Sequence, residues 1–379
     1  MARWRMVMLA STLAAAVLAV PAAAQAPAPA VTTVVSGLDN PRDLAFGPNG
    51  ELYVAEAGRG GPKCVKGGPE GATCLGFTSG ISRIDLATST ARRIVSGLMS
   101  VSDKGGSAAT GVDGISVLPD GQLYGIITGA TGLVAQLPPG KFSAKAIAKG
   151  KRQAGRLIRV SPGGKVRFGA NVGAASFAWT AAHKRKVRGQ FPDANPYGVF
   201  ATAGAQWVVD AGANTINRVV NGKVKVVKFI PNPPTSDAVP TCIDRGPDGA
   251  FYIGELTGGG NKPGASRVWR FTPSGNKLTQ WATGLTAVTG CGFAPDGQFY
   301  ATEFSTRGLD KAAPGTGAVV RVAPNSTAPT TVVGNLNFPG GFAAGSDGSL
   351  YVSNWSIAPG KAGANKPTGE VVRIAAPAS

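Results

Sequence analysis

The sequence predicts an all-β protein, folded as a six-bladed β-propeller with four-stranded blades. The first observation is a phrase that occurs six times: a short apolar segment, a tight turn, a second apolar segment and usually a polar end residue. Its clearest copy spans residues 240–255 around Pro247-Asp248-Gly249, where Pro presets φ and Gly accepts a positive φ. The second observation is that most copies lead to a third segment with Arg and an apolar pair, and then to a fourth apolar segment. Repeated four-stranded antiparallel units bury their faces against one another as propeller blades.

The expected strands can be placed in chain order. The other copies of the hairpin phrase occupy residues 42–56, 113–127, 197–210, 289–303 and 340–354. Third strands are expected at residues 80–86, 155–160, 215–220, 266–271, 318–322 and 370–374. Outer strands are expected at residues 91–98, 223–230, 278–285 and 330–336. The uneven spacing of the copies places insertions at residues 98–110, 129–154 and 171–195, and the second of these is expected to hold a short helix.

The two ends of the propeller are expected to meet in one blade. No outer strand follows residue 374, so the last blade is one strand short. Residues 32–38 (TTVVSGL) closely match the outer strands at 94–98 (IVSGL) and 330–336 (TTVVGNL). We therefore predict that an N-terminal strand, residues 31–38, closes the sixth blade. Such a pairing removes exposed strand edges, on which other chains could add.

The N-terminal residues are typical of a secretory signal peptide. Arg3 and Arg5 precede an apolar run at residues 7–20, and Ala22-Ala23-Ala24 supplies a cleavage site. We predict a signal peptide at residues 1–24, an Ala/Pro-rich tether at 25–30 and a single propeller domain at 31–379. The apolar run is too short to span a bilayer comfortably, and no later segment approaches that length. We therefore expect a secreted protein, periplasmic or extracellular, with no transmembrane segment.

The chain is strongly basic, with 38 Lys and Arg against 20 Asp and Glu and a net charge of +18. This charge would suit an anionic polysaccharide or an anionic envelope surface. Nucleic acid is not expected as a partner, because no nucleic-acid-binding motif is present. The interpretation that we favour is that Lys and Arg scattered over the loops keep an exported protein soluble. The densest basic run, residues 183–188, is either an arm that contacts an anion or a solvated turn or short helix, and we favour the latter.

Four cysteines in an exported chain predict two disulfides. Cys64 and Cys74 lie in a Gly/Pro-rich loop of the first blade, and a bond between them would close that loop. Cys242 and Cys291 lie in the first strands of neighbouring blades, which a propeller brings together around its axis. A zinc site is disfavoured, because the spacings match no zinc pattern and the chain has one histidine.

Polar residues end five of the six second strands. They are Glu56, Asp210, Glu255, Glu303 and Asn354. In a propeller these positions ring one mouth of the central channel, and the starts of the first strands, with Arg42 and Asn195, reach the same mouth. Carboxylate and amide oxygens suit Ca²⁺ or a polar ligand, and the four acids of the ring are the candidate metal ligands. The alternative is that each acid accepts hydrogen bonds from local backbone N–H groups and binds nothing. The sequence leaves both interpretations open.

Common catalytic motifs are absent. The chain has no Gly-x-Ser-x-Gly elbow, no His-Glu-x-x-His and no P-loop, so the catalytic residues, if there are any, are unknown. The single histidine, His183, lies in the basic run without an evident carboxylate or nucleophile beside it, which favours a surface role.

Several longer phrases resemble one known family. They are Pro240-Thr241-Cys242 with the segment up to residue 258, Thr289-Gly290-Cys291 with the segment up to residue 304, and residues 193–198 and 209–214. In these phrases the sequence resembles the ScyD/ScyE family of exported propeller proteins with NHL-like repeats, over nearly the whole chain after the signal peptide. The resemblance implies an exported propeller without an assigned substrate. The chain departs from the family pattern at the turn Ala203-Gly204-Ala205 and in the basic run before Gln190.

We predict a monomeric ligand-binding or scaffolding protein of the cell envelope or exterior, rather than an enzyme. Its partner would be a small polar ligand or an anionic envelope component, and Ca²⁺ is the one candidate cofactor. The alternative is a calcium-dependent, lactonase-like hydrolase with Ca²⁺ at the channel mouth.

Overall fold

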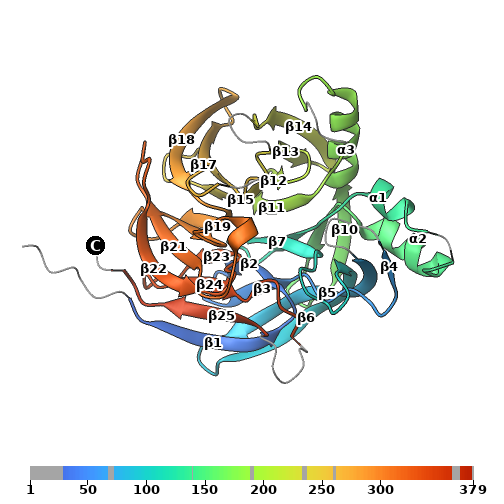
Figure 1. Ribbon diagram of the computed structural model, residues 1–379, viewed down its shortest axis with the longest axis horizontal. Coiled ribbons are helices and arrows are strands. Elements are labelled where there is room, and N and C mark those ends of the chain that lie inside the picture. The colour runs from blue at the N-terminus through green and yellow to red at the C-terminus, as the bar shows by residue number, and fades with distance from the viewer. Residues whose placement is uncertain are drawn as a thin grey trace, which may run out of the picture.

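The computed structural model describes residues 29–66, 72–138, 140–187, 192–232, 237–258, 262–360 and 368–377. The predicted signal peptide, and residues 25–28 of the predicted tether, lie outside this part of the chain. Within it, six antiparallel sheets stand around a central axis (Figure 1). The fold is the predicted six-bladed β-propeller.

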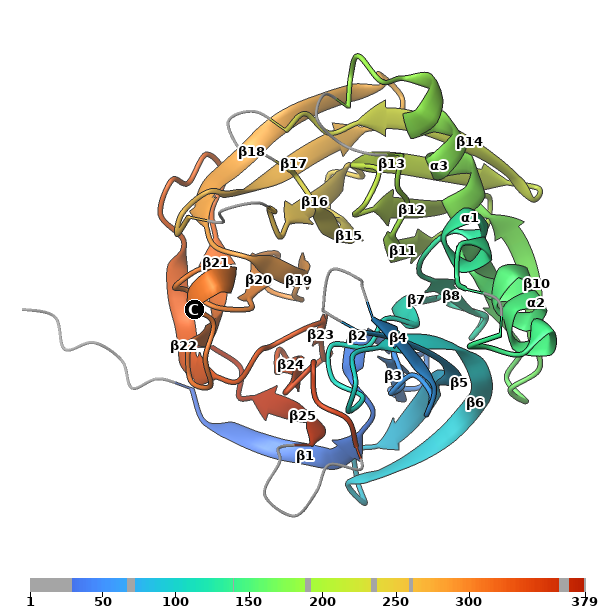
Figure 2. The ribbon, with the colours of Figure 1, turned by 45° about the vertical axis from the view of Figure 1, so that its right-hand side comes forward.

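Each blade places its first strand at the centre and its fourth strand on the outside (Figure 2). The innermost strands are β2 (Pro41–Phe46), β7 (Val112–Val117), β11 (Pro196–Ala201), β15 (Pro240–Arg245), β19 (Val288–Phe293) and β23 (Phe342–Ala344). The second strands are β3 (Leu52–Glu56), β8 (Leu123–Ile127), β12 (Gln206–Asp210), β16 (Phe251–Glu255), β20 (Phe299–Glu303) and β24 (Leu350–Asn354). The third strands are β5 (Ala72–Asp85), β9 (Arg156–Val160), β13 (Thr215–Val220), β17 (Ser266–Thr272), β21 (Gly317–Val322) and β25 (Gly369–Ile374). The outer strands are β6 (Thr90–Ser102), β10 (Val166–Asn171), β14 (Lys223–Phe229), β18 (Lys277–Leu285), β22 (Thr330–Leu336) and β1 (Val31–Leu38).

The hairpin phrase forms the turn that its residue types predict. In blade four, Gly249 has a φ of 77° and donates its N–H to the carbonyl of Gly246. Asp248 accepts the N–H of Ala250 at 3.1 Å and the hydroxyl of Tyr252 at 3.0 Å. These bonds fix the register of β15 against β16, so the apolar residues of both strands face the neighbouring blades.

The ring closes through β1, as predicted. This strand pairs antiparallel with β25, with Val31 opposite Ile374 and Leu38 opposite Gly369. Val35 and Leu38 are buried in a cluster that also contains Leu44 of blade one. The N-terminal strand therefore supplies both the missing strand of blade six and part of its contact with blade one.

The insertions carry the helices. α1 (Thr131–Ala135) and α2 (Ala144–Gln153) lie between β8 and β9, α3 (Val172–Ala182) follows β10, and the 3₁₀ helix η1 (Leu309–Lys311) follows β20. The short helix expected within residues 129–154 is therefore confirmed, in the form of two helices. No helix in the described ranges is long and apolar enough to cross a membrane.

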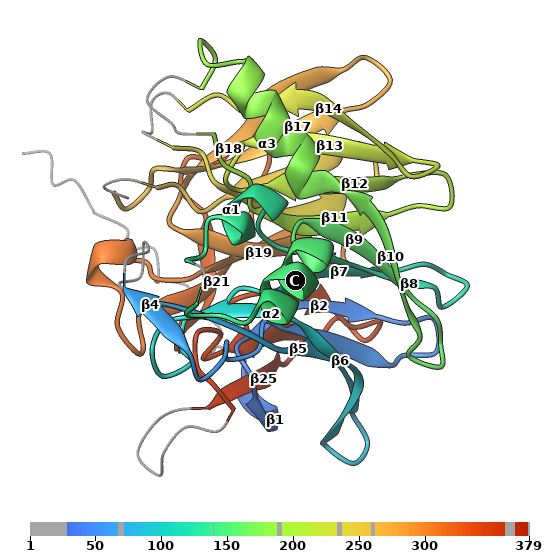
Figure 3. The ribbon, with the colours of Figure 1, turned by 90° about the vertical axis from the view of Figure 1, so that its right-hand side faces the viewer.

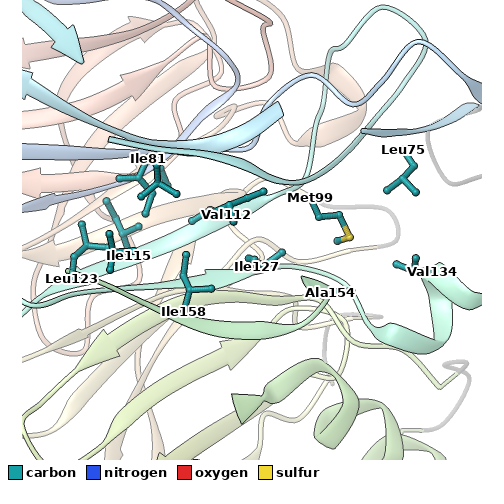
Figure 4. Packing of buried hydrophobic residues seen from close by; sticks show 14 of the residues in the cluster. Leu75, Ile81, Met99, Val112, Ile115, Leu123, Ile127, Val134, Ala154 and Ile158 are labelled. Carbon is teal, nitrogen blue, oxygen red and sulfur yellow. The ribbon is translucent and has the colours of Figure 1, made fainter. Parts of the chain in front are cut away.

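The helical insertion is attached to the propeller through the apolar core between blades one and two (Figure 4). Ile81 and Val112 are fully buried between the two sheets, and Met99 and Val134 extend the same cluster to α1. Gln153, at the end of α2, accepts the backbone N–H of Met99 at 2.6 Å. Burial of each large apolar side chain contributes about 1.5–3 kcal/mol, so these contacts stabilise the insertion against blades one and two.

Both predicted disulfides are present. Cys64 bonds to Cys74 and links the short strand β4 (Cys64–Lys66) to β5. Cys242 bonds to Cys291 and joins the innermost strands of blades four and five. The second bond therefore ties two neighbouring blades together beside the channel.

Candidate functional site at the channel mouth

The five residues expected around the channel mouth are the last residues of β3, β12, β16, β20 and β24. They are Glu56, Asp210, Glu255, Glu303 and Asn354. All five are at most 5% exposed. Buried carboxylates need hydrogen bonds or opposite charges, so the partners of each one show what it does.

Glu56 is bound within blade one. Its Oε2 accepts the backbone N–H of Asp39 at 2.7 Å and lies 2.6 Å from Nη2 of Arg93 on β6. The hydroxyl of Ser82 donates to Oε1. Both oxygens are therefore used by the blade that carries them.

Glu255 forms a buried ion pair in blade four. Arg267, which is 3% exposed, donates from Nε to Oε2 at 2.7 Å and from Nη2 to Oε1 at 2.9 Å. The indole Nε1–H of Trp269 donates to Oε1 at 2.5 Å. This two-pronged arrangement is the strongest geometry that Arg and a carboxylate can adopt. Both oxygens of Glu255 are again occupied locally.

Asp210, Glu303 and Asn354 bind backbone N–H groups of the loops that lead into the innermost strands. The donors are Asn195, Thr286 and Asn337, each at 2.7 Å from the accepting oxygen. Burial raises the pKa of Asp210 to about 6 and that of Glu303 to about 7, because these hydrogen bonds only partly offset the loss of solvent. Glu303 has no guanidinium beside it among the described residues.

The hydrogen bonds of Glu56, Glu303 and Asn354 occur in the same backbone geometry in blades one, five and six. In each blade, the residue that donates its N–H to the ring residue is followed by a non-glycine residue in the left-handed region. These residues are Asn40, Ala287 and Phe338, with φ of 50°, 50° and 47°. A left-handed conformation costs a residue with a Cβ about 1–2 kcal/mol. A buried oxygen that holds the preceding N–H stabilises this turn, and this supports the interpretation of the ring as a set of local latches.

The four acids of the ring do not converge on one point. Ca²⁺ takes six to eight oxygen ligands at about 2.3–2.6 Å. In the part of the chain that the structure describes, no group of three or more His, Cys, Asp or Glu side chains lies together in a way that could hold a metal ion. The carboxylates are directed to donors of their own blades, so in this arrangement they do not fit a shared Ca²⁺.

Arg42 lies in the channel wall. The pairing of β2 with β3 is interrupted after Pro41, and the same interruption follows the first residue of β7, β11, β15 and β19. Such bulges redirect a side chain. The residues at these positions are Arg42, Asp113, Tyr197, Thr241 and Thr289, and the last four line a central cavity. The repeated bulge thus decides which side chains fill the channel.

A polar cluster lies among the innermost strands. Nε of Arg42 lies 3.6 Å from Oδ1 of Asp113, and Nη2 of Arg42 donates to the carbonyl of Ala109. Burial raises the pKa of Asp113 to about 6, against the opposing effect of Arg42, and raises the pKa of Tyr197 to about 12. The cavity that remains has a volume of about 20 Å³, which is room for one water molecule. A ligand the size of a sugar lactone therefore cannot enter it.

Asn195 forms hydrogen bonds in the loop that leads into β11. Its N–H donates to Asp210, and its side-chain Oδ1 accepts the hydroxyl of Thr128. Thr128 follows Ile127, the residue that replaces the acid in blade two. The side chain of Asn195, from blade three, therefore binds next to Ile127, the one apolar residue of the ring.

Two channel carboxylates lay outside the predicted set. Oδ2 of Asp43 accepts the N–H of Ile115 at 3.0 Å, and Oδ2 of Asp244 accepts the N–H of Phe293 at 2.8 Å. Each bond joins an innermost strand to that of the next blade. Burial raises the pKa of Asp43 to about 7 and that of Asp244 to about 6. Nothing in the repeat could have revealed them, because the other four copies have no acid in the middle of the first strand.

No protein-family model and no curated protein matches this sequence. Solved structures do. A gluconolactonase from Xanthomonas campestris matches with a TM-score of 0.52 and 9% identity, covering 92% of this chain and 89% of that one. A putative oxidoreductase (glucose dehydrogenase) from Thermus thermophilus matches with a TM-score of 0.50 and 16% identity, covering 91% of this chain and 99% of that one. These proteins share its fold. Virginiamycin B lyase from Staphylococcus aureus, at a TM-score of 0.43 and 13% identity, covers 86% of this chain and 84% of its own. At these identities the likeness describes the propeller and carries no activity with it, and the ScyD/ScyE resemblance stays a prediction.

Proposed function

We propose that this protein is an exported, non-catalytic propeller that binds a ligand or holds a partner in the cell envelope or outside the cell. The observation that carries the proposal is the small volume, about 20 Å³, of the cavity that Asp113 and Tyr197 line among the innermost strands. A catalytic propeller needs a pocket in which substrate lies against its reacting groups. The local hydrogen bonds of the ring acids support the same conclusion. Two disulfides are compatible with an oxidising, extracytoplasmic location.

The alternative proposal is a calcium-dependent, lactonase-like hydrolase with its metal at the mouth. Glu303 is the residue that favours it. This carboxylate is 5% exposed, accepts one hydrogen bond within the described ranges and has a pKa raised to about 7. A cation beside it would stabilise its ionised form.

Calorimetric titration of residues 25–379 with Ca²⁺ separates the two proposals. The proteins to compare are wild type, Glu255→Gln, Glu303→Gln and the control Asp120→Asn, which removes an exposed turn carboxylate. We expect no heat of binding and no change in Tm on addition of Ca²⁺ for any of them. Calcium-dependent heat that is lost in Glu303→Gln and kept in Asp120→Asn would overturn the non-catalytic proposal. Hydrolysis of a δ-lactone that follows the same pattern would do so as well.

A further inference from the structure

The positive charge of this chain is concentrated in one segment. Residues 121–192 contain 13 Lys and Arg and no Asp or Glu, whereas the remainder contains 25 Lys and Arg and all 20 acids. Lys and Arg occur throughout the chain, as expected, but Asp and Glu are absent from this segment, so the net charge is unevenly distributed. Thirteen of the 18 net positive charges come from this one stretch.

The same segment forms the helical side of the molecule. α1, α2 and α3 lie together on one side of the ring, next to β9 and β10 (Figure 3). Their position is fixed, because α1 and α2 share the core of blades one and two and because Lys149 of α2 lies 4.0 Å from the centre of the Phe77 ring of β5. The cationic side chains of α2 and of the β9–β10 hairpin are thus carried on one side of the folded propeller.

A pocket of about 800 Å³ opens between α2 and the start of α3. Its apolar wall includes Phe142 and Ile147, and its cationic wall consists of Lys151, Arg152 and Arg156. Small-molecule sites typically have volumes of about 300–1,000 Å³, a mostly apolar lining and a few polar groups that orient the ligand. The pocket meets all three conditions, and no carboxylate lines it.

The cations of this pocket are only partly engaged by the protein. Lys151 and Arg152 are exposed in the last turn of α2 and form no ion pair within the part of the chain that the structure describes. Arg156 is half-buried, and its Nη1 donates to the carbonyl of Gly169 at 2.7 Å. Asn171, which caps α3 and also lines the pocket, places the positive end of that helix dipole at the same site. All of these groups favour a negative charge.

The polar floor of the pocket is held in place. Nδ2 of Asn171 donates to Oγ1 of Thr131 at 3.0 Å, and Oδ1 of Asn171 accepts the N–H of Ala174 at 2.9 Å. A ligand would therefore meet a site that is already formed, which lowers the entropic cost of binding.

We propose that this pocket binds a small organic anion. The apolar body of the ligand lies against Phe142 and Ile147, and its carboxylate, sulfonate or phosphate faces Lys151, Arg152 and Arg156. This inference gives the proposed binding function a site and a ligand class, and it is independent of the channel mouth. A metal-dependent activity at the mouth would refute the proposed function and leave the pocket unaffected.

The test uses residues 25–379 and the fluorescent aromatic sulfonate 8-anilinonaphthalene-1-sulfonate as the probe. Two variants alter the pocket in different ways. Lys151→Gln with Arg152→Gln removes two positive charges from its wall, and Ala148→Trp fills its volume with a larger side chain. The matched controls are Lys165→Gln with Arg167→Gln, which removes the same charge from the exposed β9–β10 hairpin, and Ala178→Trp on the exposed face of α3. Thermal unfolding of each variant shows whether it is folded.

We expect one saturable probe site per chain. The paired charge change should weaken binding about tenfold, since two partly exposed ion pairs are lost. Ala148→Trp should abolish binding, the controls should stay within about twofold, and added salt should weaken binding in the wild type. Unchanged affinity in a folded Lys151→Gln/Arg152→Gln variant, or in a folded Ala148→Trp variant, overturns the proposal. A third result also overturns the proposal: the wild type has no saturable probe site, and both paired charge changes weaken its retention on dextran sulfate equally. The positive charge of the segment would then bind a polyanion rather than a small ligand.

Discussion

Replacement of Glu303 by Gln separates a structural role of the channel-mouth carboxylates from a cation-binding role. Oε1 of Glu303 accepts the N–H of Thr286 at 2.7 Å, and the amide oxygen of Gln can keep that bond. Burial raises the pKa of Glu303 from its ordinary value of 4.5 to about 7. The folded protein therefore holds this proton more tightly than the unfolded chain does, and the free energy of unfolding falls as the pH rises from about 4.5 to 7. At about 1.4 kcal/mol for each pKa unit, the ionised carboxylate costs roughly 3 kcal/mol above pH 7.

The assay is urea unfolding at pH 4 and pH 8 for wild type, Glu303→Gln and the exposed control Asp120→Asn. We expect Glu303→Gln to be more stable than the wild type by roughly 3 kcal/mol at pH 8 and equally stable at pH 4, where the carboxyl is protonated in both states. Asp120→Asn should match the wild type at both values. A Glu303→Gln variant that is less stable than the wild type at pH 8 would refute the reasoning, because the ionised group would then have a favourable partner. Repetition in EDTA would show whether that partner is a metal ion.

The remaining predictions concern the framework of the ring. Leu38→Ala, at 3% exposure on the closing strand, should lower the free energy of unfolding by about 2–4 kcal/mol, whereas Val31→Ala, at 40% exposure, should change it by less than about 1 kcal/mol. Equal effects in urea unfolding would mean that the N-terminal strand does not close the ring. Joint replacement of Cys242 and Cys291 by Ala opens a loop with a sequence separation of 49 and should cost about 4 kcal/mol. A thermal unfolding curve that coincides with the wild type would contradict this. Arg267→Leu should cost about 3–5 kcal/mol, because it leaves the carboxylate at the end of β16 buried without its cation. A loss below about 1 kcal/mol in urea would show that the pair contributes little.

The small central cavity directs the search for a ligand to another part of this propeller. Arg42 lies 3.6 Å from Asp113, the cavity that Asp113 lines has a volume of about 20 Å³, and each ring acid accepts hydrogen bonds from its own blade. The contacts of the ring acids lie within the repeated blades, whereas the helical insertion interrupts the repeat and has a pocket of its own. Loops and insertions vary more readily than the strands that they connect, so exposed residues of the insertion can change while the pairing of the blades is kept.

The sequence by itself determined the blades, their order and their closure. A hairpin phrase with Pro-Asp-Gly turns is local, and local turn chemistry with alternating apolar residues sets strand pairing wherever it occurs. The match between residues 32–38 and the outer strands predicted β1, because equivalent strands in a repeat occupy equivalent environments. The pairing of Cys242 with Cys291 followed from the same equivalence.

Only the tertiary structure decided what the ring acids do. Glu56 meets Arg93 across 37 residues, and Glu255 meets Arg267 across a hairpin. Arg93 has no arginine counterpart in the other outer strands, and the one counterpart of Arg267, Arg156 in blade two, stands in the blade where Ile127 replaces the acid. The bulge that turns Arg42 into the channel depends on the backbone twist of each blade, which residue types alone do not reveal. The pocket beside α2 likewise arises where an insertion packs on the propeller. A repeated sequence predicts the strand pairing that recurs in every blade, whereas the ion pairs and the pocket are formed by contacts that occur in one blade or one insertion.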